Sequence, residues 1–341
     1  MERYRVAIVG ATGLVGQTFI KVLKQRNFPM ASIRLLASER SVGKKLFVAH
    51  QEIEVEETGH DSFEGIDIAL FSAGADTSRH FSPIAARAGA VVVDNSSAFR
   101  MEDSVPLVVP EVNLEDIQQH NGIIANPNCS TIQMVVALYP LHKVNPIKRI
   151  VVSTYQAVSG TGAAAMEELT VQSRQILEGQ STAPHVYPHQ IAFNILPEID
   201  TFLDSGYTKE EWKMVEETRK IMHAPDIAIS ATCARVPVFT GHSESVNVEF
   251  SQPMTPDEAK RLLAQAPGVK VLDDPTISLY PYPWSAAGTD DVFVGRIRQD
   301  ASCLNSLVMW IVADNVRKGA ALNTVQIAEE MVKQGWIHPR R

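Results

Sequence analysis

The sequence predicts an α/β protein in which an N-terminal domain on a parallel sheet precedes an α+β domain with a mixed, largely antiparallel sheet. In residues 1–130, short β-rich runs alternate with helical stretches, as they do in βαβ units. After Thr131 this alternation ends, and most later β-rich runs follow one another directly. No low-complexity linker or internal repeat marks a boundary. The pattern alone therefore divides the chain into a first domain, 1–128 with a returning C-terminal helix in 314–341, and a second domain, 129–313.

The N-terminal elements follow in a regular order. Strands are expected at 5–9, 33–37, 66–71 and 90–93, with helices at 14–24 and 78–88. Runs that are apolar on both faces suit a parallel sheet that helices cover on either side.

The second part of the chain mixes helices with longer β-rich runs. Helices are expected from 132 to 141 and at 163–178, 208–222 and 256–266, and strands at 149–155, 227–237, 245–250 and 291–298. The tail 318–333 has apolar residues at helical spacing and predicts one amphipathic helix that must dock on another element. The proline-containing segment 180–207 gives no readable pattern, and a subunit-contact lobe is one interpretation of it.

The composition is that of an ordinary globular protein with an acidic balance. The 341 residues include 31 Lys and Arg against 39 Asp and Glu, and this net charge of −8 argues against a nucleic-acid partner. The longest apolar runs, such as 307–313, fall far short of the ~20 residues that a membrane-spanning helix needs. The N-terminus leads into a strand instead of a signal-peptide core. We therefore expect a cytoplasmic protein without membrane contacts.

The glycines of Gly10-Ala11-Thr12-Gly13-Leu14-Val15-Gly16 form a GxxGxxG pattern between the first strand and the first helix. Glycine permits a tight turn and lets the backbone approach a pyrophosphate, and the helix N-terminus offers N–H groups to its charge. The pattern predicts a Rossmann-type cofactor site, although a plain βα turn would look similar. The expected cofactor-binding residues of this loop are Gly10, Thr12, Gly13, Leu14, Val15 and Gly16.

The end of the second strand indicates which dinucleotide is bound. Ser38, Arg40 and Ser41 supply hydroxyls and a cation that suit the 2′-phosphate of NADP. Glu39 leaves NAD as an alternative cofactor, because an acidic side chain at this place holds the ribose 2′-hydroxyl of NAD. A solvated charged turn is the simpler alternative.

One of the three cysteines has flanking residues that favour a role as a nucleophile. Cys129 lies in NPNCST at 126–131, directly before a helical run, so the helix N-terminus should favour its thiolate. Cys233 and Cys303 lie in β-rich, apolar surroundings and are interpreted as buried and inert. Three scattered cysteines make no disulfide framework, and the absence of a CxxC pair argues against zinc, so no metal is expected.

Six motifs in order resemble the aspartate-β-semialdehyde dehydrogenase family over nearly the whole chain. They are GATGLVG at 10–16, SSAFR at 96–100, NPNCST at 126–131, YQAVSGTG at 155–162, EEWK at 210–213 and RVPVFTGHSE at 235–244. The resemblance implies an NADP-binding domain, then a catalytic and dimerisation domain in a homodimer or homotetramer, with the C-terminal helix packed on the first domain. It implies reduction of L-aspartyl 4-phosphate with NADPH to L-aspartate 4-semialdehyde and phosphate, on the route to lysine, threonine, methionine and diaminopimelate.

The resemblance also assigns the chemistry. Cys129 displaces phosphate to form a thioester, hydride reduces it, and His242 exchanges the proton of the thiohemiacetal oxygen. Arg235 offers a two-pronged guanidinium to the substrate α-carboxylate, although a strand-edge salt bridge is its plain alternative. Gln156 orients the substrate near the sulfur.

Further positions carry over from the family with weaker support from the residues themselves. Arg100 and Lys213 match phosphate ligands, and Glu210 would take the substrate ammonium, although Glu and Lys three apart are common on any solvated helix. Cofactor contacts are expected from Ser159, Gly160 and Asn315.

Three other functions compete with this interpretation. N-acetyl-γ-glutamyl-phosphate reductase and malonyl-CoA reductase types share the chemistry, but the former places its cysteine in an HPGC-like context, whereas this chain has NPNC. A non-catalytic NADP-binding sensor is the third, and it would have no need of Cys129, Gln156, Arg235 and His242 together.

Overall fold

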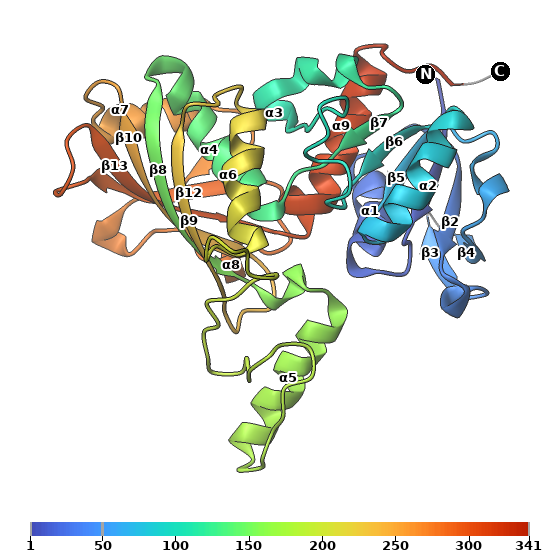
Figure 1. Ribbon diagram of the computed structural model, residues 1–341, viewed down its shortest axis with the longest axis horizontal. Helices are drawn as coiled ribbons and strands as arrows, with labels where there is room; N and C mark the ends of the chain where they lie inside the picture. The colour runs from blue at the N-terminus through green and yellow to red at the C-terminus, as the bar shows by residue number, and fades with distance from the viewer. Residues whose placement is uncertain (1, 49–50, 340–341) are drawn as a thin grey trace. The chain divides into compact units, whose positions relative to one another are not determined.

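The computed structural model describes residues 2–48 and 51–339, which form two compact units (Figure 1). Unit 1 contains the chain up to Pro127 and from Ala320 onwards, and unit 2 contains Asn128–Gly319. The C-terminal part of unit 1 thus begins at Ala320 and not at residue 314. Each unit has its own sheet.

Unit 1 is built on a seven-stranded sheet in the order β3-β4-β2-β1-β5-β6-β7. Its strands are β1 Tyr4–Val9, β2 Met30–Ala37, β3 Lys45–Val48, β4 Gln51–Glu57, β5 Ile68–Phe71, β6 Val91–Asp94 and β7 Ile123–Ala125. All neighbours pair in parallel except β3 and β4, which form an antiparallel pair at the edge. The expected parallel sheet is confirmed, with this edge pair as an addition.

Helices cover both faces of the unit 1 sheet. They are α1 Leu14–Gln25, α2 Ala75–Arg87, α3 Pro110–Asn113 and α9 Leu322–Lys333, with short 3-10 turns at Glu39–Ser41, His60–Phe63 and Leu114–Gln119. Along β1, Val6 and Ile8 enter the core that α1 and α9 share, whereas Ala7 and Val9 enter the core under α2. This alternation explains why the strand is apolar on both faces.

The C-terminal segment departs from the expected single helix over 318–333. A π-helical turn at Arg317–Ala321 precedes α9, which therefore starts at Leu322. Val325, Ala328 and Met331 of α9 are buried in the core with α1, so the C-terminal helix does pack on the first domain.

Unit 2 is built on a six-stranded mixed sheet in the order β11-β12-β13-β10-β8-β9. Its strands are β8 Ile147–Gln156, β9 Ala228–Arg235, β10 His242–Phe250, β11 Val269–Val271, β12 Val292–Gln299 and β13 Ser306–Ala313. The β8–β9 and β11–β12 pairs are parallel and the other three are antiparallel, as a mixed, largely antiparallel sheet requires. The apolar run at 307–313 is the buried strand β13.

The helices of unit 2 differ in how much of their surface is buried. They are α4 Cys129–Val144, α5 Ala163–Leu177, α6 Lys209–Ile221, α7 Pro256–Ala264 and α8 Pro283–Ala286, with 3-10 turns at Val158–Gly160 and Pro275–Ile277. Residues 130–138 of α4 are all buried, so this helix is apolar nearly all round and lies within the core. In Figure 1, α5 projects away from the sheet.

Two buried polar side chains of α5 hold part of the segment 180–207. Gln172 accepts the N–H groups of Ile191 and Ala192 at 3.0 and 3.1 Å, and Glu168 accepts that of His185 at 3.0 Å. These contacts satisfy backbone N–H groups at residues 185–192, where no helix or strand forms.

None of the helices in the part of the chain that the structure describes is long and apolar enough to cross a membrane.

Candidate active site

Cys129 is the first residue of α4, as the sequence predicts. The Asn128 side chain caps this helix, because its Oδ1 accepts the N–H groups of Ser130 and Thr131 at 2.9 and 3.2 Å. The first turn of α4 contains no acidic residue, so no carboxylate within this turn opposes the positive end of the helix dipole. Gly319 lies against the nucleophile, since a Cβ at Gly319 would come within 2.8 Å of the Cys129 Cβ.

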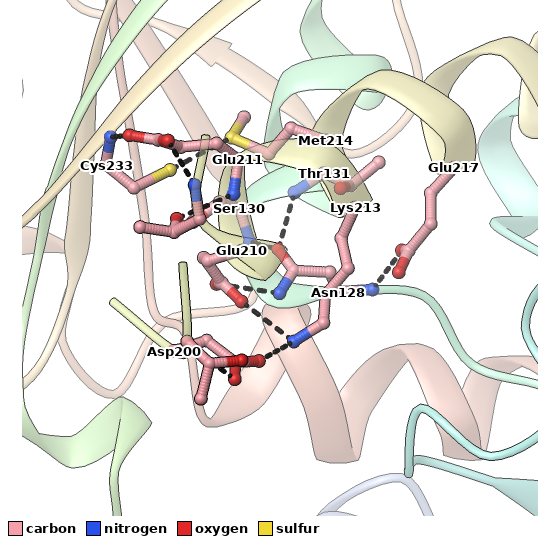
Figure 2. Close-up of polar contacts among 12 residues, drawn as sticks. Asn128, Ser130, Thr131, Asp200, Glu210, Glu211, Lys213, Met214, Glu217 and Cys233 are labelled. Atoms are coloured by element: carbon pink, nitrogen blue, oxygen red, sulfur yellow. Dashed lines mark hydrogen bonds and ion pairs between the residues drawn. The ribbon is translucent and has the colours of Figure 1, made fainter. Parts of the chain in front are cut away.

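Asn128 is held by two carboxylates of α6 (Figure 2). Its backbone N–H donates to Glu217 Oε2 at 2.6 Å, and its Nδ2 donates to Glu210 Oε1 at 2.8 Å. Both carboxylates are buried, and their separation of two helical turns places them on one face of α6. Glu217 was not predicted from the sequence, although its spacing from Glu210 along one helix face could have identified it.

His242 is the first residue of β10 and is completely buried. Its Nδ1 accepts the backbone N–H of Ala157 at 3.0 Å, and its Nε2 has no hydrogen-bond partner among the described residues. Burial and, to a lesser extent, the Arg235 charge hold the pKa of His242 well below its usual value. The imidazole is therefore neutral near pH 7.

Arg235, the last residue of β9, lies beside His242. Its Nη1 donates to the Ala157 carbonyl at 2.8 Å, and its Nε has no partner in the described part of the structure. A Cβ at Gly160 would come within 2.8 Å of Arg235 Nη1 and 3.2 Å of His242 Nε2. The two side chains thus converge where only glycine leaves space.

Gln156 and Glu210 connect this pair to the nucleophile loop. Gln156 Nε2 donates to Glu210 Oε1 at 3.1 Å, the same oxygen that accepts the Asn128 side chain. Burial raises the pKa of Glu210, but Lys213, Asn128 and Gln156 outweigh it, so the pKa is lowered and the carboxylate stays charged.

Lys213 lies between two carboxylates in Figure 2. Its Nζ is 3.2 Å from Glu210 Oε2 and 2.8 Å from Asp200 Oδ2. The lysine and Glu210 therefore share a helix face, as their spacing indicates. Arg100, the second expected phosphate ligand, lies in unit 1, where its Nη2 donates to the Asn95 carbonyl at 3.0 Å.

Ser159 and Asn315 lie together in unit 2, within hydrogen-bond distance at 3.0 Å. Asn315 Oδ1 also accepts the N–H of Gly241 at 2.9 Å, which fixes the turn before His242. Both side chains are buried. The expected cofactor residues Ser159, Gly160 and Asn315 are thus near one another and near His242.

The βα turn of unit 1 fits a pyrophosphate. Gly10 has a φ of +86°, and a Cβ on it would come within 2.2 Å of the Ser72 carbonyl oxygen. Gly16 packs as tightly, since its Cβ would lie 2.1 Å from the Gly10 oxygen. Gly13 is the N-cap of α1, and none of the described side chains caps this helix. The first N–H groups of α1 therefore remain available to an anion.

The candidate 2′-phosphate residues follow β2 in a short 3-10 turn. Ser38 is its N-cap, Arg40 is exposed, and Ser41 is buried with its Oγ 3.2 Å from Thr12 Oγ1. A hydroxyl and a cation are thus within reach of the glycine loop.

The two other cysteines differ from each other. Cys233 is fully buried, as expected, and its backbone N–H donates to Glu211 Oε1 at 2.9 Å. Cys303 is not buried, and the interpretation of it as a core residue is wrong. It lies in the polar turn before β13, where the apolar pattern has not yet begun.

Family comparisons agree with this architecture. Residues 5–120 match the semialdehyde dehydrogenase NAD binding domain, and residues 138–318 match the semialdehyde dehydrogenase dimerisation domain. The fold and the helix-borne cysteine thus define a pyridine-nucleotide-binding semialdehyde dehydrogenase.

Comparison with individual relatives shows to which family of semialdehyde dehydrogenases the chain belongs. The aspartate-semialdehyde dehydrogenase of Aquifex aeolicus is 58% identical over 98% of this chain and 99% of its own sequence. The crystal structure of aspartate semialdehyde dehydrogenase II complexed with ASA from Vibrio cholerae superimposes with a TM-score of 0.94, at 47% identity over 98% and 99% of the two chains. The enzyme from Candida albicans with NADP has a TM-score of 0.78 at 27% identity, over 98% and 100%. The chain belongs to the aspartate-semialdehyde dehydrogenase family.

Proposed function

We propose that this chain catalyses the NADPH-dependent reductive dephosphorylation of L-aspartyl 4-phosphate to L-aspartate 4-semialdehyde through a thioester on Cys129. The observation that carries the proposal is the continuous set of contacts in unit 2 that joins the cysteine loop to the Arg235–His242 pair. It runs from Asn128 through Glu210 and Gln156 to Ala157, whose backbone contacts both members of the pair. A binding module would not require this arrangement.

The charged side chains of the candidate site suggest how the substrate is recognised. The Arg235 guanidinium, whose Nε has no hydrogen-bond partner among the residues that the structure describes, is suited to the α-carboxylate. Glu210, which stays charged, is suited to the α-ammonium. Lys213 is proposed as a ligand of the phosphate group, and Arg100 keeps the same role as a family-based prediction. An amino-acid substrate with an acyl phosphate side chain carries a charge complementary to each of these groups.

NADP is the proposed cofactor, and its nicotinamide supplies the hydride. The glycine turn would hold the pyrophosphate through the first N–H groups of α1. Ser38, Arg40 and Ser41 would bind the 2′-phosphate. In unit 2, Ser159 and Gly160 are proposed to make backbone contacts with the cofactor, and Asn315 is proposed as a nicotinamide-side contact. The NADP complex of the relative from Candida albicans supports this choice.

A homodimer or homotetramer is the proposed assembly. The matched dimerisation domain supports it. Unit 2 also has a cleft of about 490 Å³ lined by aromatic residues, including Tyr155, Tyr282 and Trp310, and Tyr282 is half exposed. Aromatic residues are enriched at protein interfaces.

An assay in the phosphorolytic direction tests the function. With aspartate semialdehyde and NADP, NADPH should form only when phosphate is present. Equal rates without phosphate would identify a hydrolytic aldehyde dehydrogenase instead. A higher kcat/KM for N-acetylglutamyl phosphate or malonyl-CoA in the reductive direction would assign the chain to one of those reductases.

A further inference from the structure

The aromatic side chain of Tyr187, in the segment 180–207, lies beside the guanidinium of Arg235. The Arg235 Cζ atom is over the Tyr187 ring, 6.0 Å from its centroid, and the Tyr187 hydroxyl donates to Thr161 Oγ1 at 3.0 Å. This is the geometry of a cation–π contact, in which the negative face of an aromatic ring attracts a cation. The Arg235 side chain is therefore held by this ring as well as by the Ala157 carbonyl.

Helix α5 fixes the position of Tyr187. The Glu168 carboxylate of this helix accepts the backbone N–H groups of residues 185–186, and its Gln172 side chain accepts those of residues 191–192. The partly buried ring also packs against the apolar cluster between α5 and this segment. Tyr187 is therefore held in place from both sides along the chain.

The same segment contacts the backbone of Arg235. The Leu196 N–H donates to the Arg235 carbonyl at 3.0 Å, and the Arg235 N–H donates to the Leu196 carbonyl at 2.8 Å. Leu196 belongs to the apolar cluster that Tyr187 joins. Both sets of contacts to Arg235 thus come from one packed lobe, the α5 lobe, which consists of α5 and the segment 180–207. This lobe projects from the sheet in Figure 1, and these contacts connect it to the end of β9.

The ring can orient the guanidinium without replacing a ligand. A ring face attracts the positive charge but offers no carboxylate or carbonyl acceptor, so N–H donors of the guanidinium remain for a carboxylate. In agreement with this, the buried Arg235 Nε has no hydrogen-bond partner among the described residues. Burial raises the pKa of the Tyr187 hydroxyl above its usual value, so the ring stays neutral at pH 7. A carboxylate at this place would instead pair with the guanidinium and compete with the substrate.

We propose that Tyr187 is a specificity-determining residue that positions the Arg235 guanidinium for the α-carboxylate of the substrate. This inference rests on the proposed function and deepens it, because it assigns a role in substrate recognition to the α5 lobe. Tyr187 acts through Arg235 as a positioning residue. Its loss should therefore weaken recognition of the carboxylate and leave the chemical step at Cys129 intact.

Two aldehydes test the proposal in the presence of phosphate and NADP. L-Aspartate 4-semialdehyde carries the α-carboxylate, and 3-aminopropanal is the same molecule with hydrogen in its place. A cation–π contact corresponds to about 3- to 30-fold in an equilibrium constant, so Tyr187→Leu should lower kcat/KM for aspartate semialdehyde by about this factor, through KM and not kcat. The kcat/KM for 3-aminopropanal should change by less than about twofold, because this aldehyde has no carboxylate for Arg235 to bind.

The ratio of the two kcat/KM values is the decisive measurement, since a partly unfolded variant lowers both values alike. Tyr187→Phe keeps the ring and loses the hydrogen bond to Thr161, so it should retain the wild-type ratio. Phe202→Leu removes an exposed aromatic ring from the same segment and is the matched control, which should also retain this ratio.

An unchanged ratio in Tyr187→Leu would overturn the inference. So would a Tyr187→Phe variant that loses as much as Tyr187→Leu, because the hydroxyl and not the ring would then be responsible. Both outcomes leave the proposed function standing, since the wild-type enzyme still converts aspartate semialdehyde in a phosphate-dependent reaction. A wild-type enzyme that does not convert this aldehyde would overturn the proposed function itself, and this inference with it.

Discussion

The Glu217 carboxylate accepts the backbone N–H of Asn128 at 2.6 Å, one residue before the nucleophile Cys129. Glu210 holds the Asn128 side chain from the same face of α6. The start of α4 is therefore positioned by α6, a helix that lies about 80 residues further along the chain.

Glu217→Ala should lower kcat with little change in the dissociation constant of NADPH. The variant leaves the buried Asn128 N–H without its acceptor, which costs about 1–3 kcal/mol, and lets the cysteine loop shift. A displacement of 1 Å can cost about 10²-fold in rate. Glu217→Gln keeps an acceptor oxygen and should retain most activity, and Glu216→Gln on the same helix is the matched control. Equal kcat for Glu217→Ala and the wild type would contradict a positioning role.

Cys129→Ala should abolish turnover and leave NADPH binding largely intact, because the glycine turn of unit 1 does not include the thiol. Fluorescence titration with NADPH and a turnover assay measure the two properties. Mass spectrometry of wild-type enzyme quenched during turnover should show an acyl adduct on Cys129. Residual activity of the alanine variant near the wild-type level would refute the thioester.

Arg235→Lys should raise the KM for the amino-acid substrate strongly, since an ammonium group cannot reproduce the two parallel hydrogen bonds of a guanidinium. The substitution also removes the guanidinium N–H that donates to the Ala157 carbonyl at 2.8 Å. The KM for NADPH serves as the internal control and should change little. A rise in the KM for NADPH alone would indicate that Arg235 contacts the cofactor instead of the substrate.

Gly319→Ala should impair activity and stability together. The added methyl group would come within 2.8 Å of the Cys129 Cβ, and overpacking of this kind typically costs about 1–3 kcal/mol. Gly59→Ala is the matched control, because its Cβ would meet only the Ser62 hydroxyl at 3.8 Å. The melting temperature and kcat of the two variants are compared. Equal values for both variants would show that the backbone at Cys129 shifts without an energetic cost.

Glu244→Gln should stabilise the protein at alkaline pH. Glu244 is fully buried on β10, where neither carboxylate oxygen has a hydrogen-bond partner among the described residues, and burial raises its pKa well above the usual 4.5. Because the folded state holds this proton more tightly than the unfolded state, wild-type stability falls as the pH rises from about 4.5 through the raised pKa. The glutamine variant lacks this loss. The melting temperature of the variant should match that of the wild type near pH 4.5 and exceed it at pH 8. A difference in melting temperature that does not change with pH would show that titration of Glu244 does not affect stability.

Local features of the chain predicted much of the fold. The glycine turn and the helix after Cys129 depend on neighbouring residues, so they were found. The edge strands β3 and β4 were missed because their residues alternate with charges, as in Gln51–Glu57. Glu217 and Ala157 were missed for another reason, since their partners lie 89 and 85 residues away. Contacts of this kind depend on the folded sheet and have no periodic signal.

The burial of Cys233 has a practical consequence for chemical labelling. Burial raises the pKa of this thiol far above neutrality, so it stays protonated and inert toward electrophiles. Cys303, in its partly exposed turn, is then the remaining competitor of Cys129. A Cys303→Ser protein would carry one reactive thiol, which allows active sites to be counted by stoichiometric modification with a chromogenic reagent.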